Sequence, residues 1–520
     1  MSNFPKFAIA AGHPETAQAG AAVLEAGGNA FDAAIAALLA AFVCESATIS
    51  AGGGGFLLAH APHLPSPVLF DFFVQTPRSK RLDGNINFYP VSANFGGARQ
   101  VFHVGLAAIA TPGNIAGMFH VHKRLGKMPF AHLAEPAIAL AKRGVVLNGF
   151  QRVLTALLQP IVMASVEGRA IFATPDGLQL LSEGSHTHIA HLADTLEYLV
   201  NEGARAFYEG EIGQRLVRDC AEQGGWLTAD DLKHYQVMER QPLSLAYRNR
   251  TILTNPPPSS GGTLIGFALQ LLQSIPSAEL AHGSLRHLQA LGQVQILTNA
   301  ARRSRFDAHL YDADLSSVFL SKQHLSPYIQ TFKDSVLGST THISTIDRWG
   351  NAASLTTSSG VGNAYYIPKT GIMTNNMLGE EDLNPHGFHQ WLCNHRLSSM
   401  MSPSLVFSEG KQLELVLGSS GANRIRSAIL QTLCNFIDGA QPLDDSVQLP
   451  RLHVEDKVLN FEAGFDLNIL SQMPLSDDEK RIWENRSMYF GGVNAVSLDA
   501  KGNLWAVADN RRQGVAICSA

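Results

Sequence analysis

Apolar and polar positions follow two different spacings along the chain, and together they predict a mixture of helices and strands. Apolar residues recur at helical spacing from Pro14 to Ala26, and Asn29 to Cys44 is apolar nearly all round, as expected of a buried helix. Residues 68 to 77 are rich in β-prone side chains and end at a proline, which is typical of a strand. Strand-like and helix-like stretches then alternate to the C-terminus without an internal repeat, so the fold class is α/β or α+β.

One predicted hairpin, near residue 350, is a candidate for chemistry. Two β-type runs, Thr341 to Asp347 and Asn351 to Ser359, flank a short charged turn that contains a glycine. Pairing the runs about this turn places Thr340 opposite Ser358 or Ser359, with opposed Cβ atoms about 4.5–5.5 Å apart. A threonine at the head of a strand with hydroxyl groups across from it is unusual for a plain core strand.

Two glycine-rich segments raise the question of anion binding. The run Gly52 to Gly55 lacks a following lysine and does not open a helix, so we expect close approach of backbones here and not a phosphate loop. Gly418 to Arg424 instead leads into a predicted helix, Ile425 to Phe436. Backbone N–H groups at such a turn can hold a carboxylate or an oxyanion, and a plain strand-to-helix connection is the alternative.

Composition and charge exclude several classes of protein. The 520 residues are 45% hydrophobic, which is ample for a large core, and the formal net charge of −5 gives no signature of nucleic-acid or anionic-membrane binding. The 5 cysteines are few, odd in number and widely spaced, which favours a reducing compartment over a disulfide framework. The N-terminus has no signal-peptide pattern, and the apolar helix Ala33 to Cys44 is too short to span a bilayer. We therefore expect a cytoplasmic protein without nucleic-acid or membrane partners.

Histidines offer two further candidates. His186, His188 and His191 have suggestive spacing, but their segment is polar and no cysteine or acidic partner stands nearby, so we predict no metal site and no cofactor. His342 follows the candidate threonine by two residues. It is either a general base or a hydrogen-bonding structural residue, and strand geometry favours the second role.

Several short motifs are spread over nearly the whole chain. In order they are Gly27 to Ala34, Gly52 to Phe56, Ala206 to Gly210, Gly224 to Thr228, Asp231-Leu232, Pro256 to Gly262, Thr340 to Ser344, Gly350 to Ala352, Ser398 to Met400 and Asp509 to Arg512. Together and in this order they resemble the γ-glutamyltransferase (γ-glutamyltranspeptidase) family of N-terminal-nucleophile hydrolases.

The resemblance implies a fold and a processing event. The fold is α+β, a four-layered αββα sandwich built from both halves of the chain. A precursor of this family cuts itself before a threonine, which here places the cut between Ser339 and Thr340. The fragments, residues 1–339 and 340–520, stay together as one intertwined unit.

The implied catalytic residues surround the new chain end. Thr340 matches the nucleophile; an N-terminal threonine carries its own base, because an α-amine has a pKa of about 7.7–8.0. Ser358 falls where the family has a second threonine that holds the nucleophile. Gly421 and Ala422 fall on the Gly-Gly pair whose N–H groups form the oxyanion hole. The pairing of Thr340 with Ser358 agrees with the hairpin register, which was reached from the residues alone.

The implied substrate pocket departs from the family pattern. Ser398 and Ser399 fall on the serine pair that binds the substrate α-carboxylate, and Glu380 stands where an aspartate receives the α-amine. Phe73, however, stands in place of the arginine that pairs with that carboxylate, and an aromatic ring cannot replace a bidentate contact. Two other matches stay open. Another arginine, such as Arg78, Arg302 or Arg303, is a candidate to supply the missing positive charge. The family's asparagine after the hairpin is matched by Gly360 or Asn363.

The predicted function is a self-processing amidohydrolase or acyltransferase that acts on a small-molecule amide. By resemblance it cleaves the γ-glutamyl amide bond of glutathione or a related compound through an acyl-enzyme on Thr340. One alternative is an amidase or acylase that acts on a non-γ-glutamyl amide, because of Phe73. A second alternative is an unprocessed relative that only binds its ligand.

Overall fold

Two sheets carry most of the strands of this protein. The computed structural model describes residues 6–80, 85–94, 99–325, 328, 340–455 and 458–519. The first sheet has the strand order β20 (Val515–Cys518), β1 (Ala8–Ala11), β11 (Thr341–Ile346), β12 (Ala352–Ser358), β2 (Gly54–His60), β3 (Val68–Phe72) and β8 (Met238–Arg240). The second has the order β19 (Leu504–Ala508), β18 (Gly492–Leu498), β14 (Leu413–Ser420), β13 (Ser404–Phe407), β10 (Arg250–Thr254) and β9 (Leu243–Tyr247).

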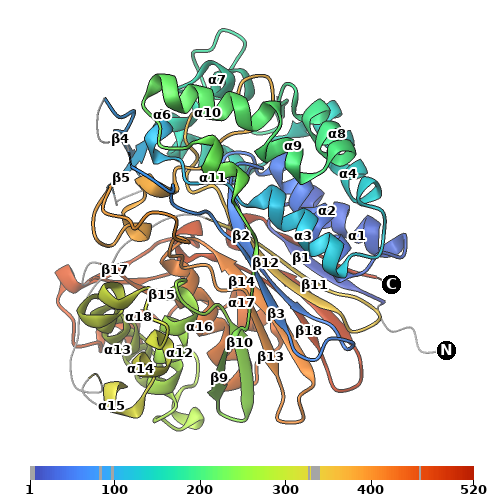
Figure 1. The fold of residues 1–520 in the computed structure, drawn as a ribbon. Coiled ribbons are helices and arrows are strands. Elements are labelled where there is room, and N and C mark those ends of the chain that lie inside the picture. The colour runs from blue at the N-terminus through green and yellow to red at the C-terminus, as the bar shows by residue number, and fades with distance from the viewer. Residues whose placement is uncertain are drawn as a thin grey trace.

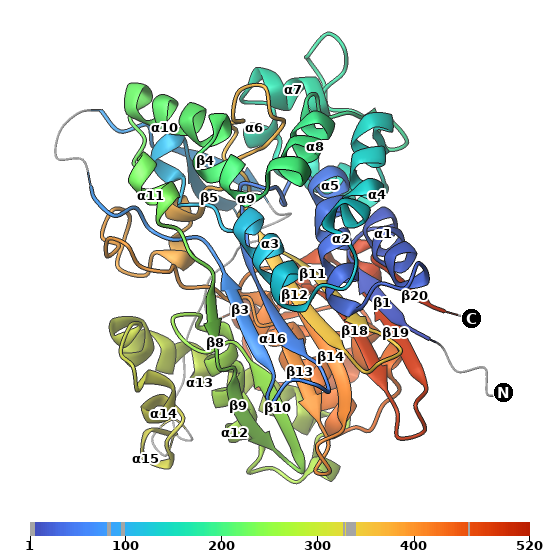
Figure 2. The same ribbon diagram turned by 45° about the vertical axis from the view of Figure 1, so that its right-hand side comes forward.

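The sheets face each other and helices cover their outer faces (Figures 1 and 2). β11 and β12 lie against β14, which joins the two sheets at the centre of the molecule. Helices against the first sheet are α1 (Pro14–Glu25), α2 (Ala30–Cys44) and α3 (Asn114–Leu125), with α4 (Phe130–Arg143) packed on α2. Helices on the side of the second sheet are α12 (Gly261–Leu272), α13 (Leu285–Ala301) and α16 (Arg424–Ile437). The chain is thus a mixed helix and sheet protein.

Smaller elements extend both helical sides. Further helices are α5 (Gly149–Leu157), α6 (Gln159–Val162), α7 (Val166–Phe172), α8 (Leu192–Glu202), α9 (Ala204–Tyr208), α10 (Glu211–Gln223), α11 (Ala229–Lys233), α14 (Leu315–Phe319), α15 (Lys322–Leu325), α17 (Leu443–Gln448) and α18 (Leu467–Ser471). Short strands outside the two large sheets are β4 (Tyr89–Asn94), β5 (Arg99–Val104), β6 (Val145–Val146), β7 (His186–Thr187), β15 (Leu452–Glu455), β16 (Val458–Phe461) and β17 (Lys480–Ile482). Of the helices in the described part of the chain, none is long and apolar enough to cross a membrane.

Helix α2 shows how the sequence builds the layer behind the first sheet. Asn29 accepts hydrogen bonds from the backbone N–H groups of Phe31 and Asp32, and the Asp32 carboxylate accepts one from the N–H of Asn29. This reciprocal cap begins the helix. Every residue from Ala30 to Cys44 is buried, so the helix packs on all sides, as the sequence predicted.

The predicted hairpin is confirmed as β11 and β12. Its ladder pairs Thr341 with Thr357, and extending this register by one residue places Thr340 opposite Ser358. The turn is held by Asp347, whose Oδ1 accepts hydrogen bonds from the N–H groups of Trp349 and Asn351. The candidate threonine therefore lies at the end of the central hairpin of the first sheet.

The glycine run after α2 brings backbones together, as expected. A Cβ atom on Gly55 would lie 2.5 Å from the carbonyl oxygen of Thr356, and one on Gly54 would lie 2.8 Å from the N atom of Val74. No side chain fits in these spaces, so β2 packs directly beside β12 and the end of β3.

Candidate active site

Most of the site residues predicted from the sequence line one small pocket at the open end of the hairpin. Only about 20 Å³ of this pocket is open to the centre of a water molecule. The predicted residues in its wall are Phe73, Thr340, Ser358, Glu380, Ser399 and Ala422. The wall also contains Met400, which ends the Ser398 to Met400 motif, and Met377, Asp382, Leu383, Met401 and Ile425. Segments far apart in the chain thus converge on Thr340.

Thr340 and Ser358 form the end of the pocket nearest the sheets. Both side chains are buried, and Thr340 is only 6% exposed. The Ser358 hydroxyl accepts a hydrogen bond from the backbone N–H of Gly360 at 2.9 Å. Ser339 lies outside the described residues.

Gly421 and Ala422 form an unusual turn between β14 and α16. Their φ angles are 114° and 48°, both in the region that L-amino acids rarely adopt. A Cβ atom on Gly421 would lie 2.9 Å from the Cα of Gly491 and 3.1 Å from a guanidinium nitrogen of Arg512, so glycine is required by space as well. An alanine held at positive φ beside a pocket is the kind of backbone strain that gathers at functional sites.

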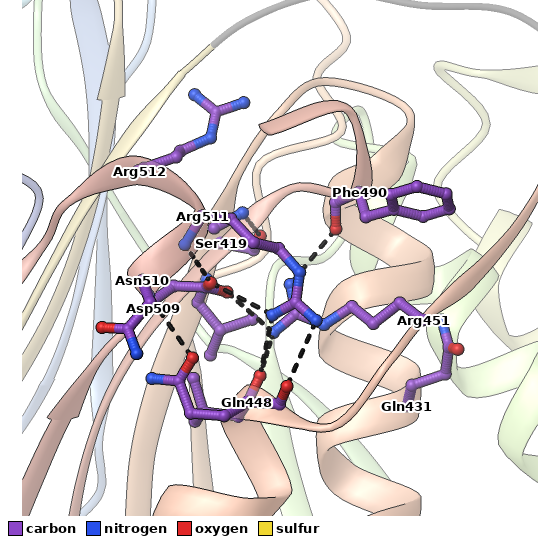
Figure 3. A network of polar contacts seen from close by, with 12 residues as sticks. Ser419, Gln431, Gln448, Arg451, Phe490, Asp509, Asn510, Arg511 and Arg512 are labelled. Carbon is purple, nitrogen blue, oxygen red and sulfur yellow. Dashed lines mark hydrogen bonds and ion pairs between the residues drawn. The ribbon is translucent and has the colours of Figure 1, made fainter. Parts of the chain in front are cut away.

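A buried ion-pair network lies behind this turn (Figure 3). Arg511 binds Asp509 at 3.1 Å and Glu462 at 2.5 Å, and Arg451 binds the other oxygen of Asp509 at 2.8 Å. Asp509 also accepts a hydrogen bond from the backbone N–H of Val493 in β18. The terminal motif Asp509 to Arg512 therefore fixes the strand next to β14, from which the turn begins.

The serine pair is held by the proline-rich turn that precedes α12. The carbonyl oxygen of Ser399 accepts hydrogen bonds from the backbone N–H of Ser260 at 2.9 Å and from the hydroxyl of Ser259 at 2.8 Å. The Ser399 hydroxyl accepts one from the N–H of Met401. Ser399 reaches the pocket wall, whereas the Ser398 hydroxyl lies 3.5 Å from that of Ser260 and is not part of the wall.

Glu380 and Asp382 bring two carboxyl groups to the pocket; Glu380 is buried and Asp382 is half-buried. Burial raises the pKa of Glu380 to about 8, helped by the negative charge of Asp382. Burial also raises the pKa of Asp382, to about 7, against the opposing effect of Arg302. One oxygen of each carboxyl, Oε1 of Glu380 and Oδ2 of Asp382, is buried without a hydrogen-bond partner in the described part of the protein. A ligand with hydrogen-bond donors would satisfy both.

A comparison with known proteins places the chain. A model of the gamma-glutamyltranspeptidase family matches residues 16–519. The chain belongs to this family. The resemblance drawn from the sequence motifs is thereby confirmed, and with it the prediction of an enzyme.

Individual relatives of this gamma-glutamyltranspeptidase family member carry two kinds of name. The present chain is 29% identical over 531 residues to an acylase ACY 1 proenzyme from Pseudomonas sp. (strain V22), and the match covers 98% of this chain and 93% of the relative. It is 28% identical over 550 residues to a glutathione hydrolase proenzyme from Bacillus subtilis (strain 168), covering 98% and 91%. Cephalosporin acylase from Bacillus halodurans shares the fold, with a TM-score of 0.81 at 20% identity over 99% of this chain and 96% of that one.

In this family member, Phe73 fills the place for which the resemblance implies an arginine. Its ring is buried and stacks on Phe56, with centroids 5.3 Å apart. Its carbonyl oxygen accepts hydrogen bonds from Tyr235 at 2.7 Å and from a buried guanidinium, that of Arg396, at 2.6 Å. Arg396 also lies 3.2 Å from Asp71, so its charge is used to hold this segment in place.

Of the three arginines considered as replacements, Arg302 comes nearest the pocket. Arg78 pairs with Asp230 at 2.8 Å on the surface, and Arg303 is exposed. Arg302 is buried and donates to the backbone carbonyl of Asp382 at 3.3 Å, but it also pairs with Asp307 at 3.1 Å. None of the three lines the pocket.

The two candidates for the family's asparagine lie in different places. Asn363 exchanges hydrogen bonds with the backbone of Gly105, at 2.6 and 3.0 Å. Gly360 lies at the pocket, because a Cβ there would lie 2.4 Å from Oε1 of Glu380 and 2.0 Å from Oδ1 of Asn376. The side chain of Asn376, which also matches the family pattern, occupies the space beside Glu380.

The histidine candidates do not line the pocket around Thr340. His342 is buried, its nitrogens lie 2.8 Å from the Thr356 hydroxyl and 2.9 Å from the Ser344 hydroxyl, and burial lowers its pKa to about 3. These contacts support the hydrogen-bonding role. Among the described residues, no group of three or more His, Cys, Asp or Glu side chains is placed to hold a metal ion.

Replacing Glu380 with glutamine is expected to flatten the pH dependence of stability. The folded-state pKa of about 8 lies above the ordinary value of 4.5, so the folded protein keeps a proton that the unfolded chain releases. This contribution to stability is complete below the unfolded pKa and is lost as the pH rises toward 8. Between about pH 5 and about pH 8.5 the melting temperature of the variant should therefore fall less than that of the wild type, by at least ~2 °C. The neighbouring, exposed Glu381→Gln is the control and should follow the wild type; equal slopes for both variants would contradict a protonated Glu380.

Proposed function

We propose that this protein is a self-processing N-terminal-nucleophile amidohydrolase whose nucleophile is Thr340. The observation that supports this best is the convergence of Thr340, Ser358 and the Gly421-Ala422 turn at one pocket. The relatives named above are proenzymes, which supports a cut between Ser339 and Thr340. We propose that fragments 1–339 and 340–520 then stay associated in a four-layered αββα sandwich.

The proposed reaction begins at the new chain end. The neutral α-amine of Thr340 takes the proton from its own hydroxyl, and Oγ attacks the carbonyl carbon of the substrate amide. The negative charge that develops on the carbonyl oxygen is stabilised by the N–H groups of Gly421 and Ala422. The C–N bond breaks, and the leaving amine takes the proton from the α-ammonium group. Water or another amine then attacks the acyl ester and frees Thr340.

Two substrate classes fit the pocket, and a different observation favours each. Glu380 and Ser399, both in the pocket wall, favour the γ-glutamyl group of glutathione or a related compound. Phe73 and the apolar side chains Met377, Met400 and Ile425 favour an acyl group without a carboxylate, because no arginine among the described residues lines the wall. The second class is the one that the geometry supports better.

Four matched p-nitroanilides separate these classes. γ-Glutamyl carries both an amine and a carboxylate, 4-aminobutyryl lacks the carboxylate, glutaryl lacks the amine, and butyryl lacks both. We expect the processed protein to cleave the 4-aminobutyryl compound with a kcat/KM at least equal to that for γ-glutamyl, because Glu380 meets an amine and Phe73 gives no partner to a carboxylate. A preference for γ-glutamyl over 4-aminobutyryl of ~10-fold or more would instead support the γ-glutamyl class. The rate of p-nitroaniline release measured with Thr340→Ala serves as the blank.

A further inference from the structure

The two faces of the central hairpin have different neighbours. Side chains of alternate residues on a strand point to opposite faces. His342 and Ser354 face the second sheet: the His342 ring abuts Gly418 of β14, and the Ser354 hydroxyl donates to the carbonyl oxygen of Leu417. The residues that alternate with His342 along β11 point to the opposite face, toward the helices. The residue after the proposed nucleophile, Thr341, is one of these.

Thr341 is bound by a carboxylate from the helical side. Its hydroxyl donates to Oε2 of Glu45 at 2.7 Å. Glu45 follows α2 directly, and its backbone N–H donates to the carbonyl oxygen of Ala41 at 2.8 Å, which ties it to the helix end. The other carboxylate oxygen, Oε1, accepts the hydroxyl of Thr16 at 2.8 Å. Both oxygens of Glu45 are therefore held by hydroxyl donors.

This contact is partly buried, and Gly12 and Glu45 also line a small opening beside it. A Cβ atom on Gly12 would lie 2.8 Å from the Thr341 hydroxyl and 2.9 Å from Oε2 of Glu45, so the backbone of the β1–α1 connection presses on the bond. Burial raises the pKa of Glu45 by disfavouring its ionised form. The positive charge of Arg512 acts in the opposite direction and lowers the pKa of Glu45. Glu45 does not line the pocket that contains Thr340. Its link to the residue next to the proposed nucleophile is the hydroxyl of Thr341, while its other oxygen holds Thr16.

We propose that Glu45 is a positioning residue for the nucleophile, and that it acts by fixing Thr341. This inference rests on the proposed function. Once the chain is cut before Thr340, the nucleophile is a chain end, and Thr341 is the first residue that the β11 ladder holds. Fixing the backbone of one residue costs conformational entropy, and a hydrogen bond to a charged group contributes a free energy of the same order. The Glu45 bond is thus large enough to decide whether the end of the chain is ordered.

The consequence is specific to turnover by the processed enzyme. A nucleophile displaced by about 1 Å can lose ~10²-fold in rate, whereas substrate binding by the pocket walls is unaffected. Loss of the Thr341–Glu45 bond should therefore lower kcat and leave KM nearly unchanged. A role in folding alone would lower stability without changing the kinetics of the folded fraction.

The test compares three hydroxyl variants of β11 in processed protein, with the anilide that the wild type cleaves best. Thr341→Val removes the hydroxyl at equal shape and should lower kcat ~10-fold or more, with KM within ~2-fold. Thr341→Ser keeps the hydroxyl and should restore kcat to within ~2-fold of the wild type. Thr345→Val is the matched control: it lies on the same face of the same strand and loses a bond to the carbonyl oxygen of Ala30, 3.0 Å long. It should lower the melting temperature and leave kcat unchanged.

Glu45→Gln gives an independent measurement if Thr341→Val fails to fold. A neutral acceptor makes a hydrogen bond about half as strong, so kcat should fall ~3-fold or more with KM unchanged. The double variant should be no slower than Thr341→Val alone, because both changes remove one interaction. A wild-type kcat in Thr341→Val or in Glu45→Gln, or an equal loss in Thr345→Val, would overturn this inference alone. A wild-type protein that neither cuts itself nor releases any anilide would overturn the proposed function and this inference with it.

Discussion

Replacing Thr340 with alanine is expected to abolish both self-cleavage and turnover. The variant should remain one chain of 56.0 kDa on a denaturing gel, whereas the wild type should give two bands. Anilide release should fall by at least ~10³-fold, because no other hydroxyl has an α-amine beside it as base. Both losses have one cause, since the same oxygen attacks the preceding peptide bond and the substrate.

Two controls make this result decisive. Thr340→Ser keeps the hydroxyl and the future α-amine, and it should still cut itself and turn over, although more slowly. Two fragments from Thr340→Ala would mean that another residue cuts the chain. A wild-type protein that stays uncut after long incubation and releases no anilide would favour the alternative of a relative that only binds its ligand.

Replacing Arg511 with methionine is expected to cause the largest loss of stability among single substitutions of this chain considered so far. The side chain is fully buried and pairs with Asp509 and Glu462, so its removal breaks two buried ion pairs, although Asp509 keeps its pair with Arg451 (Figure 3). Breaking a buried ion pair on one side costs about 3–5 kcal/mol. The melting temperature should fall by ~3–5 °C, measured on the uncut Thr340→Ala background so that a single chain unfolds.

An exposed arginine provides the matched comparison for that prediction. Arg205 is 83% exposed and pairs with Glu209 one helical turn away, at 2.7 Å. Such a pair contributes about 0–1 kcal/mol, so Arg205→Met should shift the melting temperature by ~2 °C or less. Similar shifts for the two variants would show that the Arg511 network does not carry the stability assigned to it.

The hairpin and its facing hydroxyls were predictable because they depend on local pattern. Alternation fixes which side chains share a face, and a short turn fixes the register, so Thr340 and Ser358 could be paired from the sequence alone. The glycine run was predictable for the same reason: four small residues in a strand have few explanations other than close packing. The motifs in family order then gave the enzyme family.

The contacts that shape the pocket could not be predicted, because they join distant segments. Glu45 and Thr341 are 296 residues apart, and no spacing rule relates the end of one helix to the start of a strand in another part of the chain. Asp382 follows Glu380 by two residues, yet only the folded loop brings it to the pocket wall and its carbonyl oxygen to Arg302. Arg302 was one of three arginines considered for the missing charge, and only the structure shows that it pairs with Asp307 and does not line the pocket.

The strand order of the two sheets has a further consequence for the cut protein. β1 lies between β20 and β11, β2 lies beside β12, and β10 lies beside β13, so ladders repeatedly join strands from the two sides of residue 340. After a cut there, pulling the fragments apart would break four ladders and open both sheets along their hydrogen-bonded edges. Dissociation would then be the same event as unfolding. Dilution should not separate the fragments, and a fragment made alone should aggregate or pair through its open edges.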